Sequence, residues 1–292
     1  MIDLPGGYHE ICLGKSEGKF ISSPILFHHA TMFDQFRISK EKEKEKIWAA
    51  SHDLPTKDEA VARAIRAGLW SAEQESNLKL IREDYKNYCR KRGKGKTMVF
   101  DSIRKWHEAE RMMKADIESL SAQRHAVLEQ NQESYSINKS FDYEIFILSK
   151  NADDSSFFGI DEFEDLSPVQ MDVLRSEYYT SILKFDELFF KKLAISPFFY
   201  SLFDNCAAHP SDFFRKPICE LTYFQTQMLE YGKRFNEILK YCYGAPDDFF
   251  DDPELLVTLS MFRQNGVGGE GQNDSLQDMN MDIAKNKAAK TF

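Results

Sequence analysis

The chain has 292 residues, of which 42% are hydrophobic and 29% are charged, and its net charge at pH 7 is −9. This composition is ordinary for a soluble globular protein with room for one large domain or two modest ones. The acidic balance argues against a general nucleic-acid binder, and the lack of any run of about 18 apolar residues argues against a membrane span.

Composition changes near residue 150. Residues 1–150 hold 25 Lys and Arg against 23 Asp and Glu, whereas residues 151–262 hold 9 against 20 and also contain 16 of the 24 phenylalanines. Such a change predicts a domain boundary. We expect a β-hairpin over 1–30, a helical, coiled-coil-like region over 31–150, an acidic, aromatic-rich helical domain over 151–262 and a flexible tail over 263–292.

The first element predicted is a β-hairpin over residues 7–27. Residues 8–13 alternate roughly between polar and apolar, and residues 14–18 form a turn with two glycines. Lys19 opens the second strand and Pro24 ends it or marks its edge. An isolated hairpin is only marginally stable, so this one must pack on helices or pair with another chain.

Helices with recognisable ends follow. Residues 39–50 alternate Lys with Glu and predict a solvated helix. Thr56 caps a short helix that Gly68 ends, and Ser71 with Gln74 forms a capping box for a helix that runs to about Arg92.

A long amphipathic helix over about 98–130 pairs with the preceding helix as an antiparallel helical hairpin. The apolar run 141–149 fits either a strand or a buried helix turn. The fold class is therefore mainly α, with an N-terminal β-hairpin, a long antiparallel helical hairpin, a C-terminal helical domain and a disordered tail.

In the second half, Ser167-Pro168 starts a helix that runs to about Ile195. Residues 206–217 look like a loop, residues 221–243 form a strong helix, and Asp252-Pro253 opens a last short helix to about Phe262.

No linear motif for catalysis or cofactor binding is present. Lys94-Gly95-Lys96-Thr97 ends like a phosphate-binding loop, but the required first glycine is replaced by Arg90 and a helix precedes the loop. The acidic runs at 161–165 and 247–252 lack the glycine and the twelfth-position Glu of a calcium loop. We therefore expect a protein that is not an enzyme and binds no cofactor or metal.

Five scattered cysteines predict free thiols in reducing surroundings and not a disulfide framework. One alternative stays open, because a structural zinc site needs four converging ligands. Its ligands would be Cys206, His209, Cys219 and Cys242, although 22 residues separate the last two cysteines.

Two surfaces are candidates for binding a partner. The first is a basic patch that follows Tyr85 and overlaps Tyr88, and it suits an acidic protein surface, nucleic-acid phosphates or simple solvation of a helix end. The second is Phe249-Phe250, aromatic residues set between aspartate pairs, where burial would draw carboxylates inward, so an exposed docking site competes with local packing. The basic patch consists of Lys86, Arg90, Lys91, Arg92, Lys94 and Lys96.

Two stretches carry a family resemblance. They are residues 55–73, with Pro55-Thr56 and Gly68-Leu69-Trp70-Ser71-Ala72-Glu73, and residues 221–256, with Leu221-Thr222-Tyr223-Phe224-Gln225, Leu229-Glu230-Tyr231-Gly232-Lys233, Pro246 and Asp251-Asp252-Pro253-Glu254-Leu255-Leu256. They resemble tail or baseplate structural and assembly proteins of tailed bacteriophages. The resemblance implies a non-enzymatic, chaperone-like or structural protein of the virion or host cytoplasm, whose partners are other phage structural proteins or its own copies. The alternative is a nucleic-acid-associated regulatory adaptor that uses the basic patch.

Overall fold

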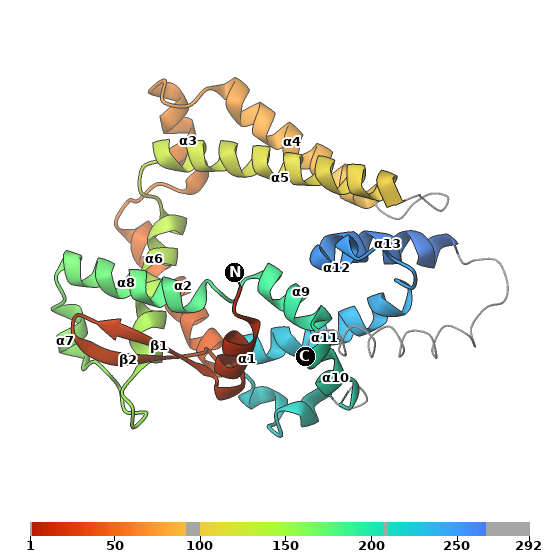
Figure 1. Cartoon of the computed structure of the whole chain (residues 1–292). Helices are drawn as coiled ribbons and strands as arrows, with labels where there is room; N and C mark the ends of the chain where they lie inside the picture. The colour runs from red at the N-terminus through yellow and green to blue at the C-terminus, as the bar shows by residue number, and fades with distance from the viewer. Residues whose placement is uncertain (1, 92–99, 207–209, 267–292) are drawn as a thin grey trace. The chain divides into compact units, whose positions relative to one another are not determined.

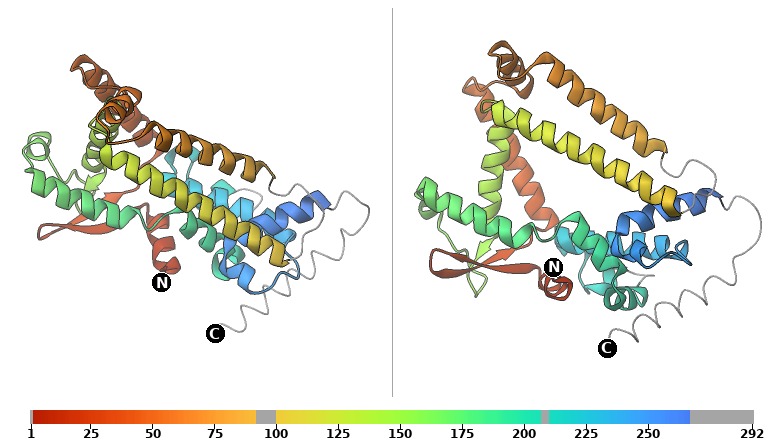
Figure 2. Two further views of the ribbon diagram at one scale, coloured as in Figure 1. Left: turned by 90° about the horizontal axis from the view of Figure 1, so that it is seen from above. Right: turned by 45° about the horizontal axis from the view of Figure 1, so that its top comes forward.

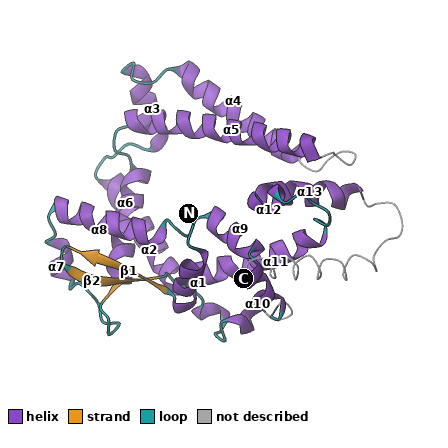
Figure 3. Ribbon diagram, in the orientation of Figure 1, coloured by secondary structure: helices purple, strands orange, loops and turns teal. Residues whose placement is uncertain are grey.

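The computed structural model describes residues 2–91, 100–206 and 210–266, and it is mainly α-helical with one small antiparallel sheet (Figures 1 and 3). The expected fold class is thereby confirmed. The expected tail begins too early at residue 263, because residues 263–266 belong to the last helix, and from residue 267 on it lies outside the described residues. Within the described part, none of the helices has both the length and the apolar character needed to cross a bilayer.

The elements follow one another along the chain in this order: α1 (Leu4–Leu13), β1 (Lys15–Phe20), β2 (Ser23–His28), α2 (Met32–Ser51), α3 (Lys57–Arg66), α4 (Ala72–Lys91), α5 (Phe100–Val127), α6 (Gln132–Leu148), β3 (Ser149–Lys150), α7 (Ile160–Glu164), α8 (Pro168–Ile182), α9 (Glu187–Ile195), α10 (Pro197–Asp204), η1 (Pro210–Phe213), η2 (Ile218–Glu220), α11 (Tyr223–Lys240), α12 (Asp248–Asp251) and α13 (Pro253–Gly266).

The first segment is a helix, and the expectation of a strand over residues 8–13 is wrong. α1 begins after Asp3, whose carboxylate accepts a hydrogen bond from the Gly6 amide, and Pro5 lies in its first turn. The helix ends at Gly14, which has a φ of 73° and donates its amide to the carbonyl of Glu10. These two local ends outweigh the weak alternation between them.

The hairpin itself is present but lies further along the chain. β1 and β2 pair antiparallel from Lys15 opposite His28 to Phe20 opposite Ser23, so the turn falls at residues 21–22 and not at 14–18. β3 then pairs with Leu26 and Phe27 of β2 and makes a third strand. The hairpin is thus stabilised within its own chain.

By its contacts the chain divides into two compact units, each discontinuous in sequence. Unit 1 comprises residues 1–56, 130–194 and 202–233, and unit 2 comprises residues 57–129, 195–201 and 234–292. Composition had suggested consecutive segments with a boundary near residue 150. The structure instead places both sides of residue 150 in unit 1, because β3 pairs with β2 there.

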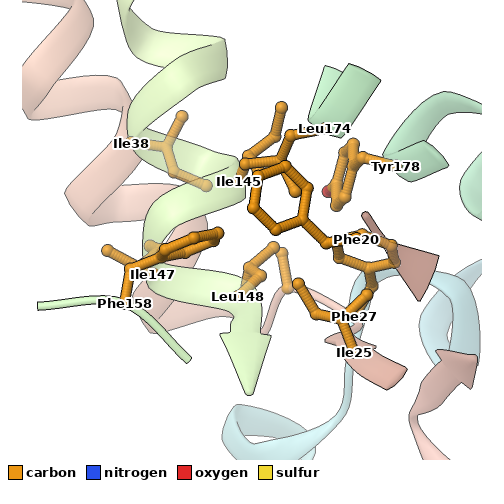
Figure 4. Packing of buried hydrophobic residues seen from close by; sticks show 11 residues of the cluster. Phe20, Ile25, Phe27, Ile38, Ile145, Ile147, Leu148, Phe158, Leu174 and Tyr178 are labelled. Carbon is orange, nitrogen blue, oxygen red and sulfur yellow. The ribbon is translucent and has the colours of Figure 1, made fainter. Parts of the chain in front are cut away.

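The core of unit 1 fills the space between the sheet and helices α2, α6 and α8 (Figure 4). Phe27 of β2 is fully buried, and its ring centroid lies 5.2 Å from that of Tyr178 in α8. Phe20, at the turn end of the hairpin, meets Phe158 at 5.4 Å. The Tyr178 hydroxyl donates to Glu144 of α6 at 2.9 Å, which gives this half-enclosed carboxylate a partner.

α2 and α6 pack against each other along their length. The contact is lined by the small buried side chains of Ala49, Ser136 and Ser140, which allow the two helix backbones to approach closely. The run 141–149, undecided from periodicity, is the end of α6 followed by the start of β3.

Unit 2 is built around the antiparallel pair α4 and α5, the helical hairpin that the sequence predicts (Figure 2). Arg124 of α5 forms a two-point ion pair with Glu75 of α4, with nitrogen–oxygen distances of 2.8 and 3.2 Å. The indole Nε1 of Trp70 donates to the same carboxylate. α13 packs on the other part of α5.

Two helix boundaries in the second half differ from expectation. One helix was expected from Ser167 to Ile195, but it is interrupted between α8 and α9, where the Asp186 carboxylate accepts a hydrogen bond from the Phe189 amide at 2.7 Å and caps α9. Pro197 was expected to end the helical region, but a new helix begins there. It occupies the first position of α10, where its missing N–H costs nothing.

Candidate functional site

The most distinctive surface of unit 1 is one face of α2, which we call the α2 face. Its residues follow helical spacings of three, four and seven, and all are exposed. Thr31 and Asp34 form a reciprocal capping box that starts the helix there. The α2 face consists of Phe33, Phe36, Arg37, Lys40, Lys44, Ile47 and Trp48.

Aromatic rings occupy the first part of the α2 face. Phe33 is 64% exposed and Phe36 is 60% exposed, which is unusual for rings that each carry so much apolar area. The ammonium of Lys40 lies 4.6 Å from the centroid of the Phe36 ring, within cation–π range. The face therefore presents apolar and cationic groups side by side.

Within residues 40–46 the helix turns two of the three glutamates toward α6. Glu41 and Glu45 are turned toward α6, where their side chains are only 23% and 16% exposed. Burial, with the neighbouring Glu45, raises the pKa of the Tyr135 phenol in α6. The outward side keeps Lys40 and Lys44, although Lys44 pairs with Glu41 at 2.7 Å and Glu43 is also exposed. A segment that is nearly neutral in sequence therefore exposes more cations than anions.

Further exposed apolar residues lie close to the start of α2. Thr31 forms a β-bridge with Thr222, and the Tyr223 amide donates to the Ala30 carbonyl at 2.7 Å, so the start of α11 is held beside the start of α2. Tyr223 is half exposed, and η2, which contacts α2, exposes Ile218. These residues extend the apolar area around Phe33.

The other end of the α2 face is an aromatic stack. Trp48 stacks on His52 at 3.9 Å between ring centroids and on Tyr135 of α6 at 5.0 Å, yet its side chain remains partly exposed beside Ile47. The stack anchors this end of the face, because each ring limits the rotation of the next.

The basic patch predicted at residues 86–96 is only partly described. Lys86, Arg90 and Lys91 are exposed near the end of α4, whereas Arg92, Lys94 and Lys96 lie outside the described residues. Arg90 donates to Asn87 one turn back.

The two tyrosines beside the basic patch face inward and not toward a ligand. The Tyr88 hydroxyl donates to the Trp106 carbonyl at 2.8 Å, and the Tyr85 hydroxyl lies 3.3 Å from the Glu110 carboxylate. Both rings therefore serve the contact between α4 and α5, and neither is presented for stacking on a nucleic-acid base.

Of the two alternatives for Phe249, an exposed docking ring and local packing, the structure shows local packing. Its side chain is 0% exposed and packs beneath the Arg104 guanidinium and against Phe100, each about 5.3 Å from the ring centroid. Two of the flanking carboxylates are paired at the surface: Asp248 accepts two hydrogen bonds from Arg104, and Asp252 meets the His107 Nε2 at 2.9 Å. Burial of the Phe249 ring therefore does not draw these two carboxylates into the interior without a partner, which is the cost that made its burial look unfavourable. Phe250 is half-buried.

A buried polar pair escaped the sequence analysis. His29 is 2% exposed, its Nε2 lies 2.9 Å from the hydroxyl of the fully buried Ser16, and its ring meets Phe185 and Phe224 edge-on. Burial, with the nearby Lys184, lowers the pKa of His29 to about 3. A Ser–His pair suggests nucleophilic chemistry, but this one is enclosed and the imidazole Nδ1 has no hydrogen-bond partner among the described residues. Its geometry suits a structural role in joining β1 to the end of β2.

The zinc alternative receives no support from the described residues. No group of three or more His, Cys, Asp or Glu side chains in that part of the chain could hold a metal ion, and His209 lies outside it. Cys242 is buried within unit 2, with its thiol 3.6 Å from the Leu256 carbonyl, and burial raises its pKa to about 12. It is packed as a small hydrophobic group.

No protein-family model, curated protein or solved structure matches this chain.

Proposed function

We propose that this chain is a non-enzymatic structural or assembly protein that acts through protein–protein contacts, in the tail or baseplate of a tailed bacteriophage. The α2 face carries the proposal. It combines exposed aromatic rings with cations on one side of a helix, and an exposed apolar patch of this kind is typical of a protein-binding surface.

The phage tail as the setting rests on the resemblance of residues 55–73 and 221–256. This resemblance implies that the partners are other structural proteins of the particle and that the protein acts in the virion or the host cytoplasm. On this chain, we expect such a partner to bind at the α2 face.

A pull-down of the tagged full chain from its native source, at low and at high salt, tests the proposal. We expect structural proteins of the particle to co-purify with the wild type and to be lost with the double variant Phe33→Ser, Phe36→Ser. Both rings are exposed, so the double substitution should change stability little. Leu80→Ser, at a leucine 60% exposed on α4, is the matched control and should capture the same proteins as the wild type.

Recovery of no structural protein with the wild type at either salt concentration would refute the proposal. Equal recovery with the double variant would refute the role of the α2 face.

A nucleic-acid-associated adaptor is the second candidate, because Lys86, Arg90 and Lys91 are exposed together. It predicts binding to duplex or single-stranded oligonucleotides at low salt, with a salt dependence that decreases when the three are replaced by Glu. A chain that binds neither oligonucleotide at low salt would rule this candidate out.

A further inference from the structure

Unit 1 carries a second surface whose chemistry is the counterpart of the α2 face. Residues 151–174 contain seven Asp and Glu and no Lys or Arg. Ile160 is 65% exposed at the start of α7, and Val169 is 72% exposed at the start of α8. The carboxylates between these two residues are exposed as well. We call this set the α7 surface: Ile160, Asp161, Glu164, Asp165 and Val169.

The α7 surface is held firmly from beneath. Phe158 and Phe163 turn inward, where Phe158 meets Phe20 of the hairpin at 5.4 Å and Phe163 meets Phe146 of α6 at 5.1 Å. The Glu162 carboxylate accepts from the Gly159 amide at 2.9 Å and caps α7. The apolar and acidic groups that remain outside are therefore presented on an ordered turn.

One copy of the chain cannot bring the two surfaces together. α7 packs on α6 through Phe163. The α2 face stacks on α6 through Trp48 at one end, whereas Phe33 and Phe36 at its other end are exposed. The start of α2 lies at the open end of the hairpin, and α7 lies at its turn end. A strand of six residues separates these two ends by roughly 20 Å. A contact between the two surfaces needs two molecules.

We infer that the α2 face of one copy binds the α7 surface of a second copy. This inference rests on the proposed function, and it identifies a second copy of the chain as one partner of the α2 face. Phe33 and Phe36 would cover Ile160 and Val169, while Lys40 and Lys44 would meet Glu164 and Asp165. Opposite charges steer and register such a contact. A two-fold contact between two α2 faces would instead set cation against cation, so charge selects the head-to-tail arrangement.

The consequence is an assembly that grows beyond a dimer. Because the two surfaces are different, each copy bound through one still offers the other, and repetition gives a ring or an open chain.

The test uses the full chain and two variants, each with one surface impaired. Phe36→Ser with Lys40→Glu impairs the α2 face, and Ile160→Ser with Glu164→Lys impairs the α7 surface. Masses are measured by sedimentation velocity at about 0.1 mM protein, in about 0.05 M and about 0.5 M NaCl. Lys42→Glu, on the same helix but outside the α2 face, and Glu83→Lys, exposed on α4, are the charge-matched controls.

We expect the wild type and both controls to form species larger than a dimer at low salt, and each impaired variant to associate at least about tenfold more weakly. A one-to-one mixture of the two impaired variants should form mainly dimers, because each pair keeps one intact contact. The two impaired surfaces lack the apolar side chains of Phe36 and Ile160, so their complementary reversed charges should extend the assembly only weakly. A circular dichroism spectrum equal to that of the wild type shows that each variant is folded.

A wild type that stays monomeric at low salt would overturn the inference. So would an α7 variant that assembles like the wild type, because the contact would then not involve the α7 surface. If the chain is monomeric but loses its pull-down partners with Phe33→Ser, Phe36→Ser, the proposed function stands and this inference alone fails. If self-assembly behaves as expected but no structural protein co-purifies, the inference stands without the proposed function.

Discussion

Acidification should weaken unit 1 in part through the side chain of His29, beside a smaller share from His28, whose pKa burial also lowers. In the folded chain burial lowers the pKa of the His29 imidazole to about 3, whereas in the unfolded chain it returns to about 6.5. Between these values the unfolded state binds a proton that the folded state does not. Stability from this group is therefore complete above pH 6.5 and is lost as the pH falls toward 3.

The size of the effect follows from the difference between the two pKa values. Each pH unit below the unfolded pKa costs about 1.4 kcal/mol, so His29 lowers the free energy of opening of unit 1 by about 2 kcal/mol between pH 7.5 and pH 5. His29→Gln keeps a polar group that can bond Ser16 but removes the titration. The variant should be less stable at pH 7.5, and its deficit should shrink by about 2 kcal/mol at pH 5.

Hydrogen exchange measured by mass spectrometry on peptides of β1 and β2 gives this free energy at both pH values. Peptides of α4 and α5 in the same sample report unit 2 and should show no difference between the wild type and His29→Gln. His125→Gln, at an exposed histidine of α5, is the control. If the wild type and His29→Gln lose equal stability on acidification, the reasoning is wrong, because His29 would then titrate alike in the folded and unfolded chains.

Three further substitutions follow from the packing, each measured by hydrogen exchange of the elements named. Phe249→Ala deletes a fully buried ring and should lower the free energy of opening of α13 by about 3 kcal/mol or more, and unchanged exchange there would contradict its burial. Glu75→Ala leaves the largely buried Arg124 guanidinium without its carboxylate and should destabilise α4 and α5 by about 3 kcal/mol. Glu73→Ala, at an exposed residue of the same helix, should cost less than about 0.5 kcal/mol. Equal losses of stability in the two variants would mean that the ion pair between Glu75 and Arg124 does not stabilise the helices. Gly14→Ala forces a side chain into a φ of 73° and should cost α1 and β1 about 1 kcal/mol, whereas Gly159→Ala, at a φ of −72°, should not show this penalty.

Features set by a few neighbouring residues were predictable from the sequence. Ser71 and Gln74 exchange the two hydrogen bonds of a capping box at the start of α4. Gly68 ends the preceding helix in the left-handed conformation, with a φ of 72°. Both depend on contacts within one helical turn, so the local sequence contains the information that decides them.

Features that depend on distant residues were not predictable. The burial of Phe249 requires Arg104 to pair with Asp248, and these two residues are 144 positions apart. The pairing of Ser16 with His29 depends on a hairpin turn at residues 21–22, and a turn placed at 14–18 hides it. With the turn correctly placed, a serine and a histidine near the open end of one hairpin would have been the signal.

The α2 face lay between these two cases. Alternating Lys and Glu predicted a solvated helix, and α2 is a helix with many exposed charges. The sorting of those charges was hidden because it depends on which side α6 covers, and that side shows only once Ala49, Ser136 and Ser140 are known to be buried. A sequence with a neutral average can therefore carry a basic surface.

The positions of the three tryptophans give the chain a built-in optical reporter. Trp48 is the one in unit 1, and it sits partly exposed at the end of the α2 face, where an arriving partner would change its solvent contact. Trp70 is 3% exposed and Trp106 is stacked on Tyr88, both within unit 2, so their emission should form a steady background. Intrinsic fluorescence of the unlabelled protein should therefore report occupancy of the α2 face in solution.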